Sequence, residues 1–345
     1  MRIGLHRTLV LAVLAAFSAA PLFAATVNDF EGGGTPVSLE IFSGTTTPGA
    51  TIEPTGGNPG GFLQLTDAVN DQHTWATFDN TDAGTFPLSQ FNFDFLIDPT
   101  ATGPSADGFS FSYADTATFG TTGGIGAAPF TAEDPAASGI LGFGFDTWSN
   151  EGTWDTPGIG TGSDYQEISV FWDGMLIERI DDTRLLGTPL VLDDATWHEV
   201  SGVVNFAAAT VSLSVDGQAI FSGLSLPGLV PFESRIMFAA RTGGENELVA
   251  IDNLLVDYLG SVVPGDANGD GVADFLDFEI IRDNLFTGRT LMEGDVDFDG
   301  DVDLGDFAFW KSVRSDAPAA IPEPAASLLL LTGLAMLLFS RRGLK

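Results

Sequence analysis

Residues 139–150 have the sequence GILGFGFDTWSN, an apolar run followed by a polar segment. The apolar run 139–145 predicts a buried strand, because short apolar runs bounded by turn residues are typical of strands in a core. A polar loop follows and carries Asp146, Asn150 and Asp155. Ca²⁺ takes about six to eight oxygen ligands in flexible geometry, so such a loop suits a hard cation. Three solvated loop side chains would give the same pattern, and the loop alone leaves both interpretations open.

The sequence pattern from residue 26 to residue 260 is typical of an all-β domain. Short runs of alternating apolar and polar residues occur at 62–65, 91–95, 200–206 and 210–215, with turn residues between them. Asp216-Gly217 is a typical hairpin turn, and no helical period of any length is visible. Many evenly spaced strands predict an antiparallel two-sheet sandwich of jelly-roll type.

Four motifs in this region occur in an order that resembles the L-type, legume-like lectins. They are ADGF at 106–109, GG at 123–124, FDTWSN at 145–150 and WDTP at 154–157. The resemblance covers roughly residues 26–260 and implies a concanavalin A-like sandwich that binds carbohydrate or polysaccharide.

The resemblance also implies a Ca²⁺ site in the loop after residue 145. Its ligands would be the carboxylates of Asp146 and Asp155, the amide oxygen of Asn150 and the carbonyl of Trp148. Where the family has Glu and His for a transition metal, this chain has Gly144 and Glu167. Imidazole nitrogen favours transition metals, so we expect Ca²⁺ alone, with Glu167 as a possible further carboxylate.

A sugar site beside the metal is implied in the same way. Asp107 would accept hydrogen bonds from sugar hydroxyls, next to a cis Ala106–Asp107 bond. Asn150 would contact both metal and sugar, and Gly124 would donate its backbone N–H. The resemblance does not identify the aromatic ring that would stack on the sugar. Further rim candidates in the loop that resembles the family's last specificity loop are Arg241, Glu245 and Asn246.

Residues 261–318 contain a repeated loop with the spacing of an EF-hand. Each copy has oxygen-bearing residues at loop positions 1, 3, 5, 9 and 12 and a glycine at position 6 for the sharp turn. Apolar residues at helical spacing follow each copy. The predicted Ca²⁺ ligands are Asp266, Asn268, Asp270, Val272, Asp274 and Asp277 in the first loop and Asp295, Asp297, Asp299, Asp301, Asp303 and Asp306 in the second.

The paired loops resemble a type I dockerin, which implies a cohesin-like partner. Polar residues at loop positions 10 and 11 contact cohesin in that family. Here these positions hold Phe275-Leu276 and Leu304-Gly305, which puts ordinary cohesin pairing in doubt. A unit this small has little core, so we expect Ca²⁺ to supply much of its folding energy.

Both ends of the chain have the pattern of targeting segments. Residues 1–25 have two arginines, an apolar run and small residues near 24 and 25, which predicts a secretory signal peptide; a membrane anchor is the competing interpretation. Residues 319–345, with Pro322-Glu323-Pro324, an apolar run and Arg341-Arg342, resemble a PEP-CTERM sorting signal. That implies an exosortase-type enzyme and a secreted or surface location in a Gram-negative-type bacterium, with transient membrane anchoring. A plain tail anchor is the alternative.

The composition limits the classes of partner. Among 345 residues, 47 are acidic and 13 basic, and cysteine is absent. This charge repels nucleic acid and anionic lipid. It suits Ca²⁺ binding, although simple solubility of an exported protein would explain it equally well. Without cysteine no disulfide can form, so we expect metal to stabilise the small parts.

We do not expect an enzyme. Retaining glycoside hydrolases of this fold use paired carboxylates, usually as Glu-x-Asp-x-x-Glu, and this chain has no such run. His73 and His198 lack a neighbouring nucleophile motif, so core or surface roles are expected for both. The leading hypothesis is a Ca²⁺-dependent carbohydrate-binding protein. A structural component of an extracellular polysaccharide matrix and a hydrolase remain the second and third.

Overall fold

The computed structural model describes residues 25–42, 45–99, 104–126, 132–150, 166–181, 191–259, 263–268, 272–288, 291–297 and 301–314. The chain divides into two compact units near residue 262. The predicted ligands Asp155, Asp270 and Asp299 lie outside the described residues, as do residues 1–24 of the expected signal peptide and all of the expected sorting segment.

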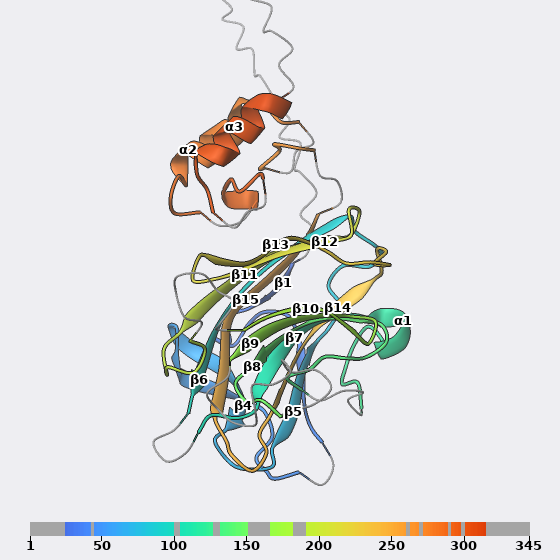
Figure 1. The fold of residues 1–345 in the computed structure, drawn as a ribbon, viewed down its shortest axis with the longest axis vertical. Helices are drawn as coiled ribbons and strands as arrows, with labels where there is room; N and C mark the ends of the chain where they lie inside the picture. The colour runs from blue at the N-terminus through green and yellow to red at the C-terminus, as the bar shows by residue number, and fades with distance from the viewer. Residues whose placement is uncertain are drawn as a thin grey trace, which may run out of the picture. The chain divides into compact units, whose positions relative to one another are not determined.

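The first unit consists of two antiparallel sheets that face each other (Figure 1). In the described part of the chain, one sheet has the order β13 (Gln218–Ser225), β12 (Thr210–Val215), β11 (His198–Asn205), β6 (Leu88–Asp98), β15 (Leu248–Leu259), β4 (Gly60–Asp67) and β3 (Thr51–Gly57), with β1 (Thr26–Asn28) paired to β15. The other has the order β10 (Met175–Asp181), β9 (Glu167–Trp172), β8 (Ile140–Asp146), β7 (Gly108–Asp115), β14 (Ser234–Arg241), β5 (His73–Phe78) and β2 (Val37–Ile41). The prediction of an all-β, two-sheet sandwich is confirmed.

The strands lie at the positions that the alternation of apolar and polar residues predicted. The runs at 62–65, 91–95 and 210–215 lie in β4, β6 and β12. Asp216 and Gly217 have φ angles of 52° and 72° and join β12 to β13. Both values are positive, as the favoured two-residue hairpin turn requires. One short helix, α1 (Thr116–Phe119), was not expected, because four residues are too few to show a helical period.

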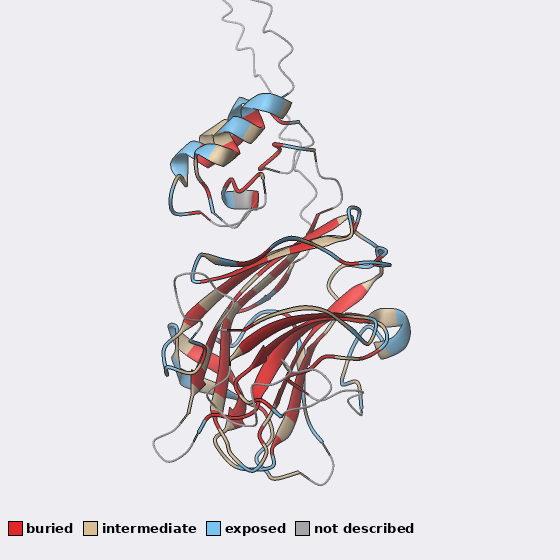
Figure 2. Ribbon diagram, in the orientation of Figure 1, coloured by how far each residue is buried: buried red, intermediate tan, exposed pale blue. Residues whose placement is uncertain are grey.

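Phenylalanine forms much of the core between the sheets. Side chains alternate faces along a strand, so residues two apart point the same way. Phe93 and Phe95 of β6 and Phe109 of β7 are fully buried. Much of the length of the strands in both sheets is buried (Figure 2). The rings of Phe109 and Phe145 stack with centroids 4.6 Å apart. Such aromatic pairs contribute about 0.5–1.5 kcal/mol each beyond their buried area.

The other face of the seven-stranded sheet is covered by the chain around α1 and by residues 132–137. Ala132 and Ala137 pack there with Trp75 and Met237 in a second apolar cluster. The main chain of Glu133 lies very close to the sheet at Gly144. A Cβ added at Gly144 would be 2.2 Å from the carbonyl oxygen of Glu133. This packing leaves no room for a side chain at position 144.

The second unit contains α2 (Phe275–Asp283), the 3₁₀ turn η1 (Leu291–Glu293) and α3 (Leu304–Val313). Both helices begin with a capping box, formed by Asp274 with Asp277 and by Asp303 with Asp306. Trp310 is buried and its ring lies 5.3 Å from that of Phe278. No helix within the described ranges is long and apolar enough to cross a membrane.

Candidate functional site

One end of the seven-stranded sheet brings Asp107 between two other chain segments. The first residue of β7, Gly108, is paired with Arg241 of β14 on one side and with Asp146 of β8 on the other. The backbone N–H of Asp107 donates to the carbonyl of Arg241 at 3.1 Å, and the carbonyl of Asp107 accepts from the N–H of Thr147 at 3.3 Å. The backbone of Asp107 is therefore held on both sides.

The glycine of the Asp-Gly pair is required at this place. Gly108 has a φ of 120°, a conformation that favours glycine. A Cβ there would lie 2.2 Å from the carbonyl oxygen of Phe145 on β8. The expected cis bond between Ala106 and Asp107 is confirmed.

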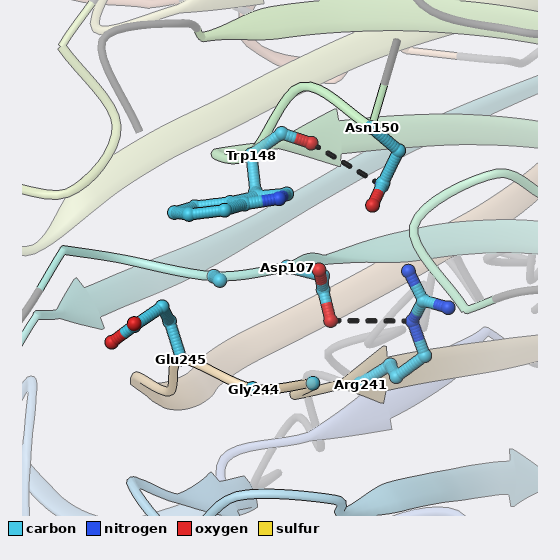
Figure 3. A pocket seen from close by; sticks show the side chains of 8 residues that line it. Asp107, Trp148, Asn150, Arg241, Gly244 and Glu245 are labelled. Carbon is cyan, nitrogen blue, oxygen red and sulfur yellow. Dashed lines mark hydrogen bonds and ion pairs between the residues drawn. The ribbon is translucent and has the colours of Figure 1, made fainter. Parts of the chain in front are cut away.

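Asp107 opens onto a pocket of about 290 Å³ at this edge (Figure 3). The loop after β8 supplies one side of the pocket, and the start of β7 and the loop after β14 supply the other. Of the sugar-site residues expected from sequence, Asp107 and Asn150 are thus brought together. The lining residues are Ala106, Asp107, Trp148, Asn150, Arg241, Gly243, Gly244 and Glu245.

Trp148 contributes more than its predicted carbonyl. Figure 3 shows its indole ring on one side of the pocket, with Asp107, Arg241 and Glu245 on the other. The carbonyl of Trp148 accepts a hydrogen bond from the Asn150 amide at 3.4 Å. The half-buried indole is a candidate for the stacking aromatic that the sequence left unidentified. The only sequence signal available was the presence of a tryptophan in the loop.

Arg241 is the one cation among the described residues that line the pocket. Its Nε lies 3.4 Å from Oδ2 of Asp107, and its Nη2 forms an ion pair with Glu133, whose side chain is 1% exposed. Burial raises the pKa of Glu133 well above its ordinary value, against the opposing charge of Arg241. Burial also lowers the pKa of Arg241, but the carboxylates of Glu133 and Asp107 outweigh it and hold that pKa above its usual value.

Sequence reasoning did not identify Glu133. Its segment has no strand pattern and no motif, and Glu133 reaches Arg241 only because its main chain crosses Gly144. Its proximity to Arg241, far away in sequence, could not be read from local spacing.

Glu247 lies behind the pocket and connects its two sides. It is fully buried, and its Oε2 accepts from the hydroxyls of Ser105 at 2.5 Å and Thr147 at 2.8 Å. Ser105 lies two residues before Asp107, and Thr147 directly follows Asp146. Burial raises the pKa of Glu247 to about 8, although both hydrogen bonds act in the opposite direction.

The predicted metal ligand Asp146 is also buried, at 2% exposure. Its Oδ1 accepts from the backbone N–H of Trp148 at 2.8 Å. Glu167 lies opposite Asp146 in the β8–β9 register, is equally buried, and has Arg179 at 3.7 Å. Together with the amide oxygen of Asn150, the donors available here are oxygen atoms, which fit Ca²⁺ rather than a transition metal.

Gly124 does not line the pocket. Its neighbours Ile125 and Gly126 donate backbone N–H groups to the carboxylate of Glu40 at 2.7 and 3.1 Å. A Cβ at Gly124 would lie 2.3 Å from the carboxyl carbon of Glu40. In this structure the glycine permits close packing against Glu40, and the expected hydrogen bond from its N–H to a sugar gains no support from the pocket's lining.

The remaining candidate residues fall into those that line the pocket and those that do not. Glu245 and Arg241 line the pocket, whereas the Asn246 amide donates to Asn70. The His73 ring packs against Trp75 with ring centroids 4.4 Å apart, and burial lowers the pKa of His73 to about 4. His198 lies between two carboxylates, with Nδ1 2.7 Å from Asp216. Both histidines contact other side chains of the sandwich and are not among the residues that line the pocket.

The two loops of the second unit have the same internal hydrogen bonds. In the first, Asp277 accepts from the backbone N–H groups of Ala267 at 2.8 Å and Asp274 at 2.7 Å. In the second, Asp306 accepts from Val296 at 2.8 Å and Asp303 at 2.7 Å. The last acidic residue thus closes each loop, as the repeat in the sequence suggests.

Carboxylate oxygens converge inside the second loop. One oxygen each from Asp295, Asp297 and Asp306 lies within 4.8 Å of the others, and so does a set from Asp301, Asp303 and Asp306. A compact group of oxygen donors fits Ca²⁺. In the first loop the described candidates are Asp266, Asn268, Val272, Asp274 and Asp277.

No family model and no curated protein matches the chain. Among solved structures, it is similar to a peanut lectin with a nine-residue peptide (16% identity, 68% of this chain and 96% of the lectin covered, TM-score 0.47). It is also similar to the Ca²⁺-bound exoplasmic/lumenal domain of VIP36 (12% identity, 69% and 91% covered, TM-score 0.45). A third is the seed lectin of Lotus tetragonolobus (13% identity, 64% and 91% covered, TM-score 0.43).

Proposed function

We propose that the first unit is a carbohydrate-binding, lectin-like module that depends on Ca²⁺. The observation that carries this proposal is the pocket in which Asp107, Asn150 and the indole of Trp148 converge. A carboxylate that accepts from hydroxyls, an amide and an aromatic face are the groups that a pyranose ring can engage together. The oxygen donors beside the pocket add support for the metal.

Each group would have a distinct part in binding. Asp107 is 4% exposed and its backbone is bonded on both sides, so its carboxylate has a fixed position for two sugar hydroxyls. The indole of Trp148 would cover the apolar face of the ring. Ca²⁺, held by Asp146, Asn150 and the carbonyl of Trp148, would fix the conformation of this loop when bound.

A hydrolase gains less support from the same residues. Glu133 has a raised pKa, as a general acid needs, and it is near Asp107. However, it is 1% exposed, does not line the pocket and is paired with Arg241. A group in that position does not reach a substrate bound in the pocket, so we propose binding without catalysis.

A glycan array tests the proposal with the purified whole chain, in Ca²⁺ and in chelator. We expect glycan binding in Ca²⁺, and we expect Asp107→Ala and Trp148→Ala to abolish it. Asn150→Ala should weaken binding, while Asn246→Ala, which makes the same change outside the pocket lining, should not. Absence of all glycan binding by a folded protein that Ca²⁺ still stabilises would favour the matrix-component hypothesis.

The ends and the second unit are proposed to serve export and attachment. We infer that residues 1–25 direct secretion, that an exosortase-type enzyme processes residues 319–345, and that the paired Ca²⁺ loops join the chain to a partner or stabilise its stalk. Mass spectrometry of the mature protein from its producing cell would test the first two. An intact C-terminus on the exported protein would reject the processing step, and Ca²⁺-dependent capture by a cohesin module would test the third.

A further inference from the structure

We propose that Glu133 sets the charge selectivity of the pocket, so that it accepts uncharged sugars and rejects uronates and other acidic sugars. This inference rests on the proposed carbohydrate binding at Asp107. It concerns a buried residue outside the pocket lining, which acts through Arg241 and does not touch the ligand.

Arg241 by itself would make the pocket attractive to acidic sugars. Guanidinium pairs readily with carboxylates and can do so through two parallel hydrogen bonds. The Arg241 side chain is 26% exposed, lines the pocket and lies beside the position where Asp107 would hold a sugar (Figure 3). A carboxylate at C6 of a pyranose would therefore have a cation within the same cavity.

Two carboxylates already offset this cation. Asp107 faces its Nε at 3.4 Å, and Glu133 engages its Nη2. Glu245 adds a further acidic group to the lining. Arg241 and the proposed Ca²⁺ together carry three positive charges. The carboxylates of Asp107, Glu133, Glu245 and Asp146 carry four negative ones. The site therefore keeps an excess of negative charge, and like charges brought together at a binding site oppose association.

Glu133 is the residue that can be changed without removing the sugar's own contacts. Asp107 is needed for hydroxyl binding, whereas Glu133 is buried behind Arg241. Glu133→Gln keeps the size of the side chain and an oxygen that can accept from Nη2. The opposing charge of Arg241 favours the ionised form of Glu133, so the change removes one negative charge and leaves the guanidinium more available to a ligand.

The experiment compares sugars that differ only at C6: glucose with glucuronate, galactose with galacturonate, and mannose with mannuronate. Each is immobilised and titrated with the purified whole chain in Ca²⁺. We expect wild type to prefer the uncharged member of the pair that it binds by at least about tenfold. In Glu133→Gln the affinity for the matching uronate should rise by about tenfold, with little change for the uncharged sugar.

Two further variants isolate the cause. Asp115→Asn makes the same kind of change at the opposite end of β7 from Asp107, and it should leave the preference nearly unchanged. Glu133→Gln combined with Arg241→Gln removes both members of the ion pair, and it should abolish the gain in uronate binding. The double variant also avoids leaving Arg241 without Glu133 if the single variant folds poorly.

The outcomes separate this inference from the proposed function. Equal binding of sugar and uronate by wild type, or an unchanged preference in folded Glu133→Gln, overturns the selectivity role while carbohydrate binding stands. If wild type binds no member of any pair and no glycan on the array, the proposed function fails, and the role of Glu133 fails with it.

Discussion

Replacement of Glu247 by Gln should make the first unit progressively more stable than wild type as the pH rises. Glu247 is fully buried behind the pocket, and burial raises its pKa from 4.5 to about 8. Gln keeps an oxygen that can accept from Ser105 and Thr147 but has no proton to lose. The substitution therefore removes the titration while it keeps the shape.

The size and sign follow from proton linkage. Between pH 4.5 and about 8 the folded carboxyl keeps a proton that the unfolded one has lost, so the folded state binds more protons and stability falls as pH rises. The contribution is fully present below pH 4.5 and is lost as pH rises through about 8. One pKa unit corresponds to about 1.4 kcal/mol, so from pH 5 to pH 8 the free energy of unfolding of Glu247→Gln should gain about 4 kcal/mol relative to wild type.

Urea denaturation at pH 5, 6, 7 and 8, followed by far-ultraviolet circular dichroism with chelator present, measures this difference. Taking variant minus wild type cancels the other acidic groups. Glu245→Gln, on the half-buried pocket rim, controls for the loss of one carboxylate. A difference between Glu247→Gln and wild type that stays constant from pH 5 to pH 8 would refute the account of Glu247 as a protonated buried acid.

Three other changes test the packing and the loops. Gly144→Glu should lower the melting temperature sharply, because a Cβ there meets the carbonyl of Glu133 at 2.2 Å; a melting temperature equal to wild type would contradict the described path of residues 132–134. Phe93→Ala should cost about 3–5 kcal/mol in urea denaturation, since it removes a fully buried ring; a cost below 1 kcal/mol would show a loosely packed core. Asp306→Ala should remove one Ca²⁺ equivalent in calorimetric titration and reduce Ca²⁺-induced helicity, because this carboxylate closes the second loop and belongs to both oxygen groups there; unchanged stoichiometry would reject that loop as a Ca²⁺ site.

The amino-acid sequence by itself determined the elements whose signal is local. Alternation of phenylalanine with polar residues predicted β6, and the Asp216-Gly217 pair predicted the hairpin after β12. The repeated acidic loop, with apolar residues at helical spacing after each copy, predicted two loop–helix units where α2 and α3 lie. Each loop's hydrogen bonds join residues within about ten positions of one another. Such features need no knowledge of distant contacts.

Only the tertiary structure decided how the pocket is completed. The indole of Trp148 and the ion pair of Arg241 with Glu133 depend on which loops meet at one sheet end. The same applies to Gly124, where the carboxyl group of Glu40 on β2 occupies the space that a side chain would need. These contacts join segments far apart in the chain, and their charge and packing arise only when the sandwich brings those segments together, so no local spacing of residues encodes them.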